Sequence, residues 1–336
     1  MKNILKILFY LLFATVSFYA KADDLSEVVN NCGINIGIEG LSSYDSNNKL
    51  EGFDVEFCKA FAVAYMNDEN KVRFVDVALT ERFDALLDKR IDILFGNTTI
   101  NFNRSTIDGI LFSATSLFDK QFVLIKDEFN VERLKELDGK TLTACYLNGS
   151  NNKDNLLKYL NANNIKLSIA EKNYENNDFE TFTLNDCDLL MNDSIYLNSY
   201  KNHNPHFKDY HLLEDEISFD AMSLVVRRNV KIAKSMRIIF YTMVLASEKG
   251  LNSGNIDKVL SKTKDYEILK VFSKDSEFAK EYGMIKGFAY NIVKKVGSYS
   301  EIYEKTLGKY EGLKSIKDKN KILKEGGLIF APPIGK

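Results

Sequence analysis

The chain has 336 residues, of which 45% are hydrophobic and 27% charged, and its formal net charge is −2. A chain so close to neutral is not expected to bind nucleic acid or an anionic membrane surface. Its length suits two domains with a sizeable hydrophobic core.

Residues 1–22 have the pattern of a secretory signal peptide. Lys2 and Lys6 form a basic start, residues 7–20 are mostly apolar, and Ala20-Lys21-Ala22 is a small-x-small cleavage site. An uncleaved membrane anchor is the weaker alternative, because the apolar run is short for the roughly 20 residues that span a bilayer. We expect an exported mature chain that begins at Asp23. Losing three lysines changes its net charge from −2 to −5.

Strands and helices alternate after this segment. Short apolar runs predict strands at residues 34–38, 72–77 and 91–95. Between them, Asp54 is placed to cap a helix that ends near Met66, and Thr80 to cap a short helix. Strand–helix–strand units of this size indicate a parallel sheet with right-handed crossovers.

A polar loop directly follows the third of these strands. It contains Asn97, Thr98 and Thr99 and reaches Arg104. Hydroxyl and backbone N–H groups donate single hydrogen bonds, and a guanidinium can donate two in parallel, so the combination suits a carboxylate. On spacing alone, an ordinary polar loop with a surface arginine is the better interpretation.

The pattern then restarts as a second, smaller α/β unit. Strands are expected at residues 141–146, 166–170 and 188–191, with a helix at 152–161. Extended apolar runs at residues 121–125 and 223–226 flank this unit. The sequence therefore predicts one lobe interrupted by another, with two crossings between them. The expected divisions are a signal peptide at 1–22, the first part of lobe 1 at 23–119, lobe 2 at 120–220, and the return to lobe 1 with a C-terminal helical extension at 221–336.

A long helix is expected after the second crossing. It should run from residue 231 to 249, capped by Asn229 and ended by Gly250. Its stripe of Ile232, Met236, Ile239 and Met243 is interpreted as core.

Four cysteines and three histidines are the candidates for disulfide, metal or catalytic chemistry. Cys32, Cys58, Cys145 and Cys187 form an even set in an exported chain, which favours disulfides, with three possible pairings. His203, His206 and His211 cluster in a polar stretch, and we expect a surface loop rather than a metal or catalytic site.

Six stretches together resemble a known family. They are Cys32-Gly33-Ile34, residues 52–58, residues 97–104, Cys187-Asp188 with Asp193, residues 289–293 and residues 326–333. In these, the chain resembles the extracytoplasmic solute-binding proteins of ABC transporters, in the polar amino acid class and its general L-amino-acid-binding branch. The resemblance implies an α/β, two-lobed periplasmic-binding-protein fold of type II. Each lobe would be a mostly parallel sheet flanked by helices, joined by two hinge crossings.

The resemblance also implies residue roles. Arg104 would hold the ligand carboxylate, with Asn97, Thr98 and Thr99 as neighbouring donors, and Asp193 of the other lobe would hold the ammonium. Without the resemblance, Asp193 is better interpreted as a helix N-cap. Gly149, Ser150 and Asn151 would add lobe-2 contacts, and Arg82 is either pocket lining or a solvated helix residue.

Several positions depart from the family pattern. Leu41 and Leu50 stand where the branch usually has aromatic residues, and Phe95-Gly96 where a Ser-Arg pair is common. Leu147 and Asn151 depart from the usual Gln-Thr-Gly-Thr-Thr-type loop. These differences are expected to affect side-chain preference.

The function implied is amino acid capture in the periplasm for an inner-membrane ABC permease, by a monomer without cofactor, metal or enzymatic activity. Two alternatives remain: a periplasmic enzyme of the same fold, similar to cyclohexadienyl dehydratase, and a ligand-binding module for a chemoreceptor. Disulfides within each lobe would leave the hinge free, and the branch has cysteines at all four places. We therefore predict Cys32–Cys58 and Cys145–Cys187.

Overall fold

The computed structural model describes residues 31–174, 187–203 and 205–335, so the expected signal peptide lies outside the described residues. Its main sheet has the strand order β4-β1-β5-β11-β6-β9-β7-β8, with β10 paired to β6. The strands are β1 (Asn31–Ile34), β4 (Arg73–Asp76), β5 (Ile93–Leu94), β6 (Ile110–Lys126), β7 (Thr141–Leu147), β8 (Ser168–Tyr174), β9 (Leu189–Asp193), β10 (Tyr210–Leu212) and β11 (Ser218–Arg227), beside a small hairpin of β2 (Ser43–Tyr44) and β3 (Leu50–Glu51).

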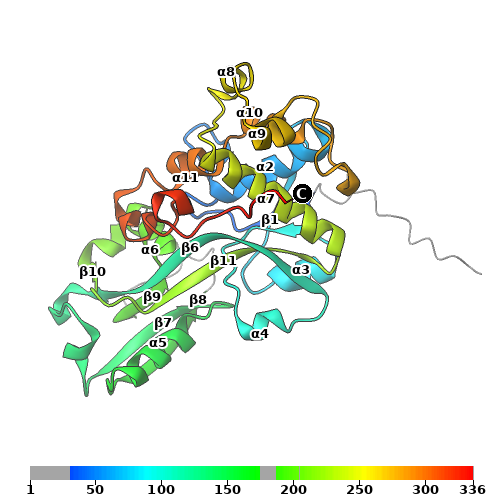
Figure 1. Cartoon of the computed structure of the whole chain (residues 1–336). Helices are drawn as coiled ribbons and strands as arrows, with labels where there is room; N and C mark the ends of the chain where they lie inside the picture. Colours follow the sequence, from blue (N-terminus) through cyan, green and yellow to red (C-terminus); the bar gives the residue numbers. More distant parts are fainter. Residues whose placement is uncertain (1–30, 175–186, 204, 336) are drawn as a thin grey trace, which may run out of the picture.

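Strands β6 and β11 are the two crossings of this two-lobed fold. They pair antiparallel from Gln121 opposite Ser218 to Ile110 opposite Arg227, with register shifts near Ser223. Beyond β11, strands β5, β1 and β4 pair parallel to one another, and beyond β6, strands β9, β7 and β8 do the same. The junctions of β5 with β11 and of β9 with β6 are antiparallel. Figure 1 shows both long strands running between the unit of β7, β8 and α5 and the helices around α2 and α7. The crossings are therefore paired strands within one continuous sheet.

Helices cover both lobes. The α-helices are α2 (Phe53–Met66), α3 (Arg82–Leu87), α4 (Phe102–Ser105), α5 (Asn152–Ala162), α6 (Ser194–His203), α7 (Val230–Glu248), α8 (Ile256–Leu260), α9 (Tyr266–Phe272), α10 (Phe288–Lys295), α11 (Tyr299–Thr306) and α12 (Lys314–Lys317). None of the helices in the described ranges combines the length and apolarity that a membrane span requires.

Helix α7 matches its prediction closely. The Asn229 side chain accepts from the N–H groups of Lys231 and Ile232, and Gly250 follows the helix with a φ of 67°. The expected stripe (Ile232, Met236, Ile239 and Met243) is at most 2% exposed. It packs in the larger hydrophobic cluster together with α2, α10 and α11.

Three predicted details of lobe 1 are wrong. Gly52, not Asp54, is the N-cap of α2, and Asp54 lies buried in its first turn. A Cβ at Gly52 would lie 2.1 Å from the Leu41 carbonyl oxygen, so only glycine fits this close approach. The first strand is residues 31–34 rather than 34–38, because its partner β4 pairs only as far as Ile34 and the chain turns at Gly37. Thr80 is likewise not the cap of α3, whose N-cap is Glu81.

Both predicted disulfides are present. The Cα atoms are 6.1 Å apart in Cys32–Cys58 and 5.8 Å apart in Cys145–Cys187, within normal disulfide geometry. Each bond lies on one side of the β6–β11 pair, so neither one fixes the two lobes to each other.

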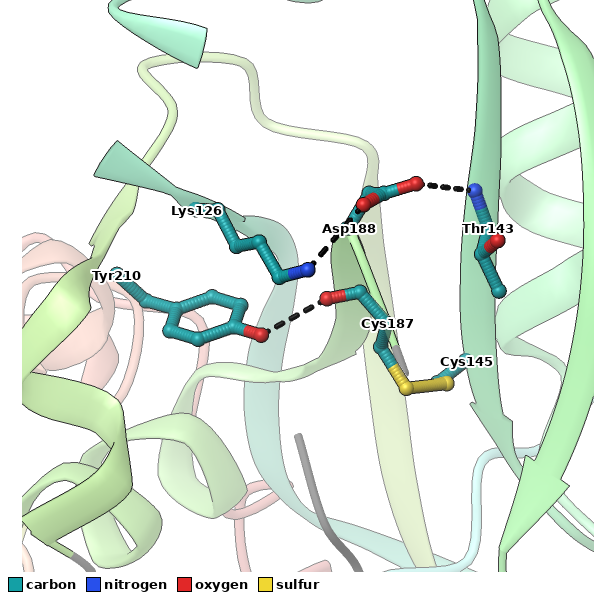
Figure 2. The surroundings of a disulfide bond; sticks show 6 residues. All are labelled: Lys126, Thr143, Cys145, Cys187, Asp188 and Tyr210. Carbon is teal, nitrogen blue, oxygen red and sulfur yellow. Dashed lines mark hydrogen bonds and ion pairs between the residues drawn. A yellow bond between two sulfur atoms is a disulfide. The ribbon is translucent and has the colours of Figure 1, made fainter. Parts of the chain in front are cut away.

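The lobe-2 disulfide belongs to a network that orders β7 against β9 (Figure 2). Asp188 accepts from the Thr143 N–H over 2.7 Å and from Lys126 Nζ over 3.3 Å. The Tyr210 hydroxyl donates to the Cys187 carbonyl over 2.8 Å. Parallel strands β7 and β9 are thus fixed at one end, and their other ends lead to Gly149 and Asp193.

The C-terminal extension binds the first crossing strand. The Asn320 side chain accepts from the Phe118 N–H and donates to the Phe118 carbonyl, both over 2.8 Å. Asn320 is 1% exposed, and it also donates to Ile316 within its own segment. The extension therefore supports β6 close to the expected hinge.

Candidate ligand-binding site

The loop after β5 is held against the crossing strand β11. Thr99 forms a β-bridge with Met222, and the Ser223 N–H donates to the Thr98 carbonyl over 3.0 Å. The two hydroxyls are used locally, because Thr98 donates to Gly96 and Thr99 contacts the Met222 sulfur. Backbone bonds therefore fix this loop beside the crossing.

Arg104 lies in the short helix α4 at the end of that loop. Asn101 caps the helix by accepting the Arg104 N–H over 2.8 Å. The Arg104 guanidinium donates from Nη1 to the Thr99 carbonyl over 3.0 Å and from Nη2 to the Gly149 carbonyl over 3.2 Å. Gly149 follows β7, so Arg104 makes a contact from one lobe to the other.

Arg82 binds the same carbonyl oxygen. It begins α3, is 3% exposed, and donates from Nη2 to Gly149 over 2.9 Å. Its Nε is buried without a hydrogen-bond partner. The Phe83 ring centroid lies 5.2 Å from the Arg82 guanidinium carbon and 6.0 Å from that of Arg104. The interpretation of Arg82 as a solvated helix residue is therefore wrong.

Arg82 is a buried cation and Arg104 a half-buried one, and neither has a charged partner at close range. Burial and then the Arg104 charge lower the pKa of Arg82 to about 9, against opposing effects of Tyr196 and Asp193. Burial also lowers the pKa of Arg104, which Asp193 and Asp220 oppose. Among the described residues, neither guanidinium has a carboxylate oxygen within 4.0 Å. This end of the site is electropositive.

Asp193 provides the opposite charge from the other lobe. It ends β9, and its carboxylate accepts from Asn97 Nδ2 and from Gln121 Nε2, each over 2.7 Å. Burial, followed by the charge of Asp220, raises the pKa of Asp193 from 3.8 to about 7. The two hydrogen bonds and Arg104 act in the opposite direction.

Asp119, not Asp193, receives the N-terminus of α6. The Ile195 N–H donates to Asp119 Oδ2 over 3.3 Å, and the Ser194 hydroxyl donates to its other oxygen. Asp119 is fully buried, and burial and the charge of Asp193 raise its pKa well above the ordinary value. The helix-cap interpretation of Asp193 is thus wrong, because the Asp193 oxygens bind amide groups in the cleft.

The loop at residues 147–151 brings its backbone close to lobe 1. Gly149 has a φ of 73°, and a Cβ there would lie 3.0 Å from the backbone of Leu79 and Thr80. The Ser150 hydroxyl donates to the Leu147 carbonyl over 2.6 Å, and Asn151 Oδ1 accepts from Gln121 over 3.1 Å. Gly149 contributes its carbonyl to the arginines, whereas Ser150 and Asn151 support the loop.

Sequence reasoning missed Gln121 and Asp220. Gln121 is completely buried and donates to Asp193, Asn151 and Asn152, while its Oε1 accepts from Asn155 and Ser218. Asp220 accepts from Ser218 over 2.8 Å, and burial raises its pKa. Both lie where the crossings were expected. The sequence signal available for each is its polar side chain beside the apolar residues of its crossing strand, and this signal does not place the two residues relative to each other.

Leu41 and Leu50, which stand where the branch usually has aromatic residues, differ in their distance from the site. Leu41 lines a small cavity of about 10 Å³ with Asp54, Asn97 and Thr98, which is room for about one water molecule. Leu50 lies in β3 and packs at the margin of the main core. Of the two leucines, Leu41 is therefore the one beside the site.

The histidines do not form one loop. His203 ends α6, and His211 lies in β10 with Nδ1 2.7 Å from Asp127 Oδ1 and Nε2 2.7 Å from the Val131 carbonyl. The expected loop location is therefore wrong for His211, because it pairs with β6. The side chain of His206 lies outside the described residues. No group of three or more potential metal ligands occurs in the part of the chain that the structure describes.

Two α/β lobes joined by two crossing strands define a two-lobed periplasmic binding protein. The chain belongs to the bacterial extracellular solute-binding proteins, family 3, whose family model matches residues 31–309.

Relatives along nearly the whole chain support this membership. The glutamate/glutamine/aspartate/asparagine-binding protein BztA of Rhodobacter capsulatus is 30% identical over 327 residues, covering 96% of both chains. The general L-amino acid-binding periplasmic protein AapJ of Rhizobium johnstonii is 29% identical, covering 94% of both. A periplasmic binding protein from Brucella ovis, solved with glutathione bound, superposes with a TM-score of 0.83 at 26% identity, covering 94% of this chain and 98% of that one.

Proposed function

We propose that this protein binds an L-amino acid between its lobes and delivers it to an ABC-type permease. The observation that carries the proposal is the charge arrangement across the cleft: Arg82 and Arg104 from lobe 1 converge at Gly149, and Asp193 from lobe 2 contacts Asn97. A zwitterion carries the complementary pair of charges. BztA and AapJ, whose names describe amino acid binding, support the same ligand class.

Arg104 binds the ligand carboxylate in this proposal. Its planar guanidinium can donate two parallel hydrogen bonds, which the neutral carbonyls of Thr99 and Gly149 now receive singly. The buried loop of Thr98 and Thr99 provides the wall and backbone dipoles beside it. Asp193 binds the ammonium, with Asn97 and Gln121 orienting its carboxylate.

Binding and closure are coupled in this arrangement. Removing a zwitterion from water is costly unless each charge meets a partner. Because the partners come from different lobes, both charges are satisfied only when the cleft is shut, so the ligand stabilises the closed state. We assign residues 23–119 and 221–336 to lobe 1 and residues 120–220 to lobe 2.

The cellular role follows from the family. Family members are extracytoplasmic binding proteins, and we propose that residues 1–22 direct export of this chain as a signal peptide. The mature protein then acts in the periplasm as a monomer that presents its ligand to an inner-membrane ABC permease. We propose binding without catalysis, because the Asp193 and Asp119 carboxylates are engaged in orienting hydrogen bonds.

A calorimetric screen tests this function. The mature chain, oxidised and purified, is titrated with the common L-amino acids and with their D-enantiomers as controls. We expect at least one L-amino acid to bind with a micromolar Kd, or about −8 kcal/mol, and its D-enantiomer to bind much more weakly. If none of the L-amino acids binds, the proposed function is wrong.

A further inference from the structure

We propose that Glu39 is a positioning residue for closure: it holds helix α6 of lobe 2 against lobe 1 and thereby raises the affinity for every ligand of the cleft by the same factor. Glu39 lies in lobe 1, in the segment between β1 and β2. The effect on affinity rests on the proposed function of the cleft, whereas the effect on the two lobes is measurable without a ligand.

Two hydrogen bonds join Glu39 to α6. Its backbone N–H donates to the Ser199 hydroxyl oxygen over 3.0 Å, and its carboxylate accepts from Asn202 Nδ2 over 2.7 Å. The ring nitrogen Nδ1 of His203 lies 4.0 Å from the same carboxylate. These partners lie in the last part of α6 and span more than one helical turn. A single residue of lobe 1 therefore contacts the whole C-terminal end of this lobe-2 helix.

The segment that carries Glu39 is itself fixed within lobe 1. The Phe53 N–H at the start of α2 donates to the Gly40 carbonyl over 2.8 Å. A Cβ at Gly40 would lie 2.9 Å from the Leu307 side chain and 3.3 Å from the Tyr310 ring, so the segment packs tightly on the C-terminal extension. Burial and then the charge of Glu39 raise the pKa of Tyr310. Glu39 is thus held on lobe 1 while its side chain contacts lobe 2.

The C-terminal extension also contacts α6 directly. A Cβ at Gly312 would lie 2.1 Å from Asn198 Oδ1, so only glycine fits this close approach. Figure 1 shows α6 beside the red C-terminal part of the chain. Consecutive residues of α6, Asn198 and Ser199, therefore contact the extension and the Glu39 segment.

Helix α6 connects the Glu39 contacts to the proposed ammonium site. Asp193 is the last residue of β9, and α6 begins at the next residue, Ser194. Ser199 and Asn202 follow about 7.5 and 12 Å further along the helix axis, at 1.5 Å per residue. Because a helix moves as a unit, holding its last turn against lobe 1 also limits where Asp193 lies. Glu39 therefore stabilises the closed arrangement of the lobes.

The Glu39 contacts use none of the groups assigned to the ligand, which are Arg104, Asp193 and the loop at residues 97–99. A residue that favours closure without contacting the ligand changes the equilibrium between open and closed forms. The same factor then applies to every ligand that binds the closed form. The change falls on the dissociation rate, because the closed complex must open before the ligand leaves.

Distances between two spin labels test the effect on the lobes without a ligand. The structure contains no free cysteine among its described residues, so Asn161→Cys on α5 and Lys258→Cys on α8 provide two exposed labelling sites, one on each lobe. Figure 1 shows α5 and α8 at opposite ends of the molecule. By double electron–electron resonance, the ligand-free mature protein should populate a short, closed distance, and Glu39→Ala should at least halve that population. A protein without this population, or an unchanged population in the variant, would overturn the inference.

Stopped-flow kinetics test the effect on affinity, with L-glutamate, L-glutamine and L-alanine as probes. Glu39→Ala should raise the dissociation rate constant about threefold to tenfold, as expected for one lost hydrogen bond to a charged group. The factor should be the same for each probe that binds, and the association rate constant should change by less than twofold. An increase confined to one probe, or no increase, would overturn the inference. If the protein binds no L-amino acid, the proposed function is wrong, and the label distances alone decide the role of Glu39.

Two further variants separate this role from a general loss of stability. Asn202→Ala removes the partner on lobe 2 and should reproduce the effect of Glu39→Ala, and the double variant should add little to either. Glu51→Ala is the matched control, because Glu51 lies in β3 of lobe 1 and pairs with Lys309 at 3.6 Å. It should behave like the wild type in both measurements. Fully additive effects of Glu39→Ala and Asn202→Ala would contradict their action as a pair.

Discussion

Arg104 and Asp193 stand at opposite ends of the proposed ligand, and each residue depends on neighbours that fix its direction. Asn101 orders the helical turn that carries Arg104, and Gln121 with Asn97 holds the Asp193 carboxylate. Because these hydrogen bonds already fix the two side chains, less conformational entropy is lost when the ligand binds. The site is therefore preorganised for a small ligand.

Replacing Arg104 should remove most of the affinity. Arg104→Ala leaves the bound carboxylate buried without its main partner, at a cost of about 3–5 kcal/mol, so Kd should rise more than 100-fold by calorimetry. Arg104→Lys should also bind poorly, because an ammonium cannot reproduce two parallel donors. Arg228→Ala is the control, since Arg228 is exposed and pairs with Asp108. An Arg104→Ala variant with wild-type affinity would place the carboxylate elsewhere.

Asp193 should make binding dependent on pH. Burial raises its pKa from 3.8 to about 7, so in the free protein the proton is bound more tightly than in the unfolded chain. The tighter binding of this proton stabilises the folded protein. The stabilisation is fully present below about pH 4 and is lost as the pH rises through 7. The ligand's ammonium favours the ionised form, so binding releases protons and affinity falls as the pH decreases below 7.

Calorimetry between pH 5 and 8, in buffers of different ionisation enthalpy, measures both the proton release and the change in affinity. We expect proton release on binding near pH 6 and none near pH 8. Asp193→Asn should bind weakly and without this pH dependence. If the variant keeps the wild-type slope, another group, such as Asp119 or Asp220, is responsible.

At the scale of elements, strands β7 and β9 position lobe 2's part of the site. The Cys145–Cys187 bond and Asp188 hold these parallel strands together at one end (Figure 2), and their far ends deliver Gly149 and Asp193. An error in register between β7 and β9 would separate the two groups.

Removing this disulfide should destabilise the protein. The bond closes 42 residues of sequence, and the chain-entropy model gives about 3–4 kcal/mol for loops of this size. Cys145→Ser with Cys187→Ser should lower the free energy of unfolding by that amount in urea titrations. The Cys32–Cys58 bond closes 26 residues, so Cys32→Ser with Cys58→Ser should lower the free energy of unfolding by slightly less. A loss below about 1 kcal/mol for both pairs would contradict the stabilising role.

The C-terminal extension should stabilise the first crossing through Asn320. Asn320→Ala leaves the partly buried N–H and carbonyl of Phe118 without their side-chain partner, so the free energy of unfolding should fall by about 2 kcal/mol, roughly 1 kcal/mol for each lost hydrogen bond. Asn161→Ala, on an exposed face of α5, should change it by less than about 0.5 kcal/mol. Equal unfolding midpoints in urea for Asn320→Ala and the wild type would show that the extension does not support β6.

The sequence was most informative where local chemistry decides the structure. The cap at Asn229 and the end at Gly250 were predictable because both act within one helical turn. The start of α2 was not, because Gly52 is required by a contact with Leu41, a residue eleven positions earlier. The roles of Arg104 and Asp193 in ligand binding were predicted from the family resemblance. Spacing alone favoured a surface arginine for Arg104 and a helix cap for Asp193.

Gln121 and Asp220 could not be placed from the sequence. They meet because β6 and β11 pair antiparallel, with Gln121 opposite Ser218 and Asp119 opposite Asp220, about 100 residues apart in the chain. No local pattern encodes that register. The sequence likewise could not show that Arg82 is buried, since burial depends on the approach of Gly149 from the other lobe.

At the scale of the whole molecule, the structure has the lobes in contact. Gly149 packs against the backbone of Leu79 and Thr80, Asn97 bonds to Asp193, and Asn35 donates to the Tyr196 hydroxyl over 3.0 Å. All three contacts join lobe 1 to lobe 2 beside the β6–β11 crossing. Opening would break these contacts together, so ligand entry requires rotation about the two strands.

A crystal structure of the mature protein with its bound L-amino acid tests the central claim most directly. It should show the ligand enclosed between the lobes, its α-carboxylate within hydrogen-bonding distance of the Arg104 guanidinium and its ammonium on the Asp193 carboxylate. A ligand bound on one lobe alone, or with its carboxylate away from Arg104, would contradict this account.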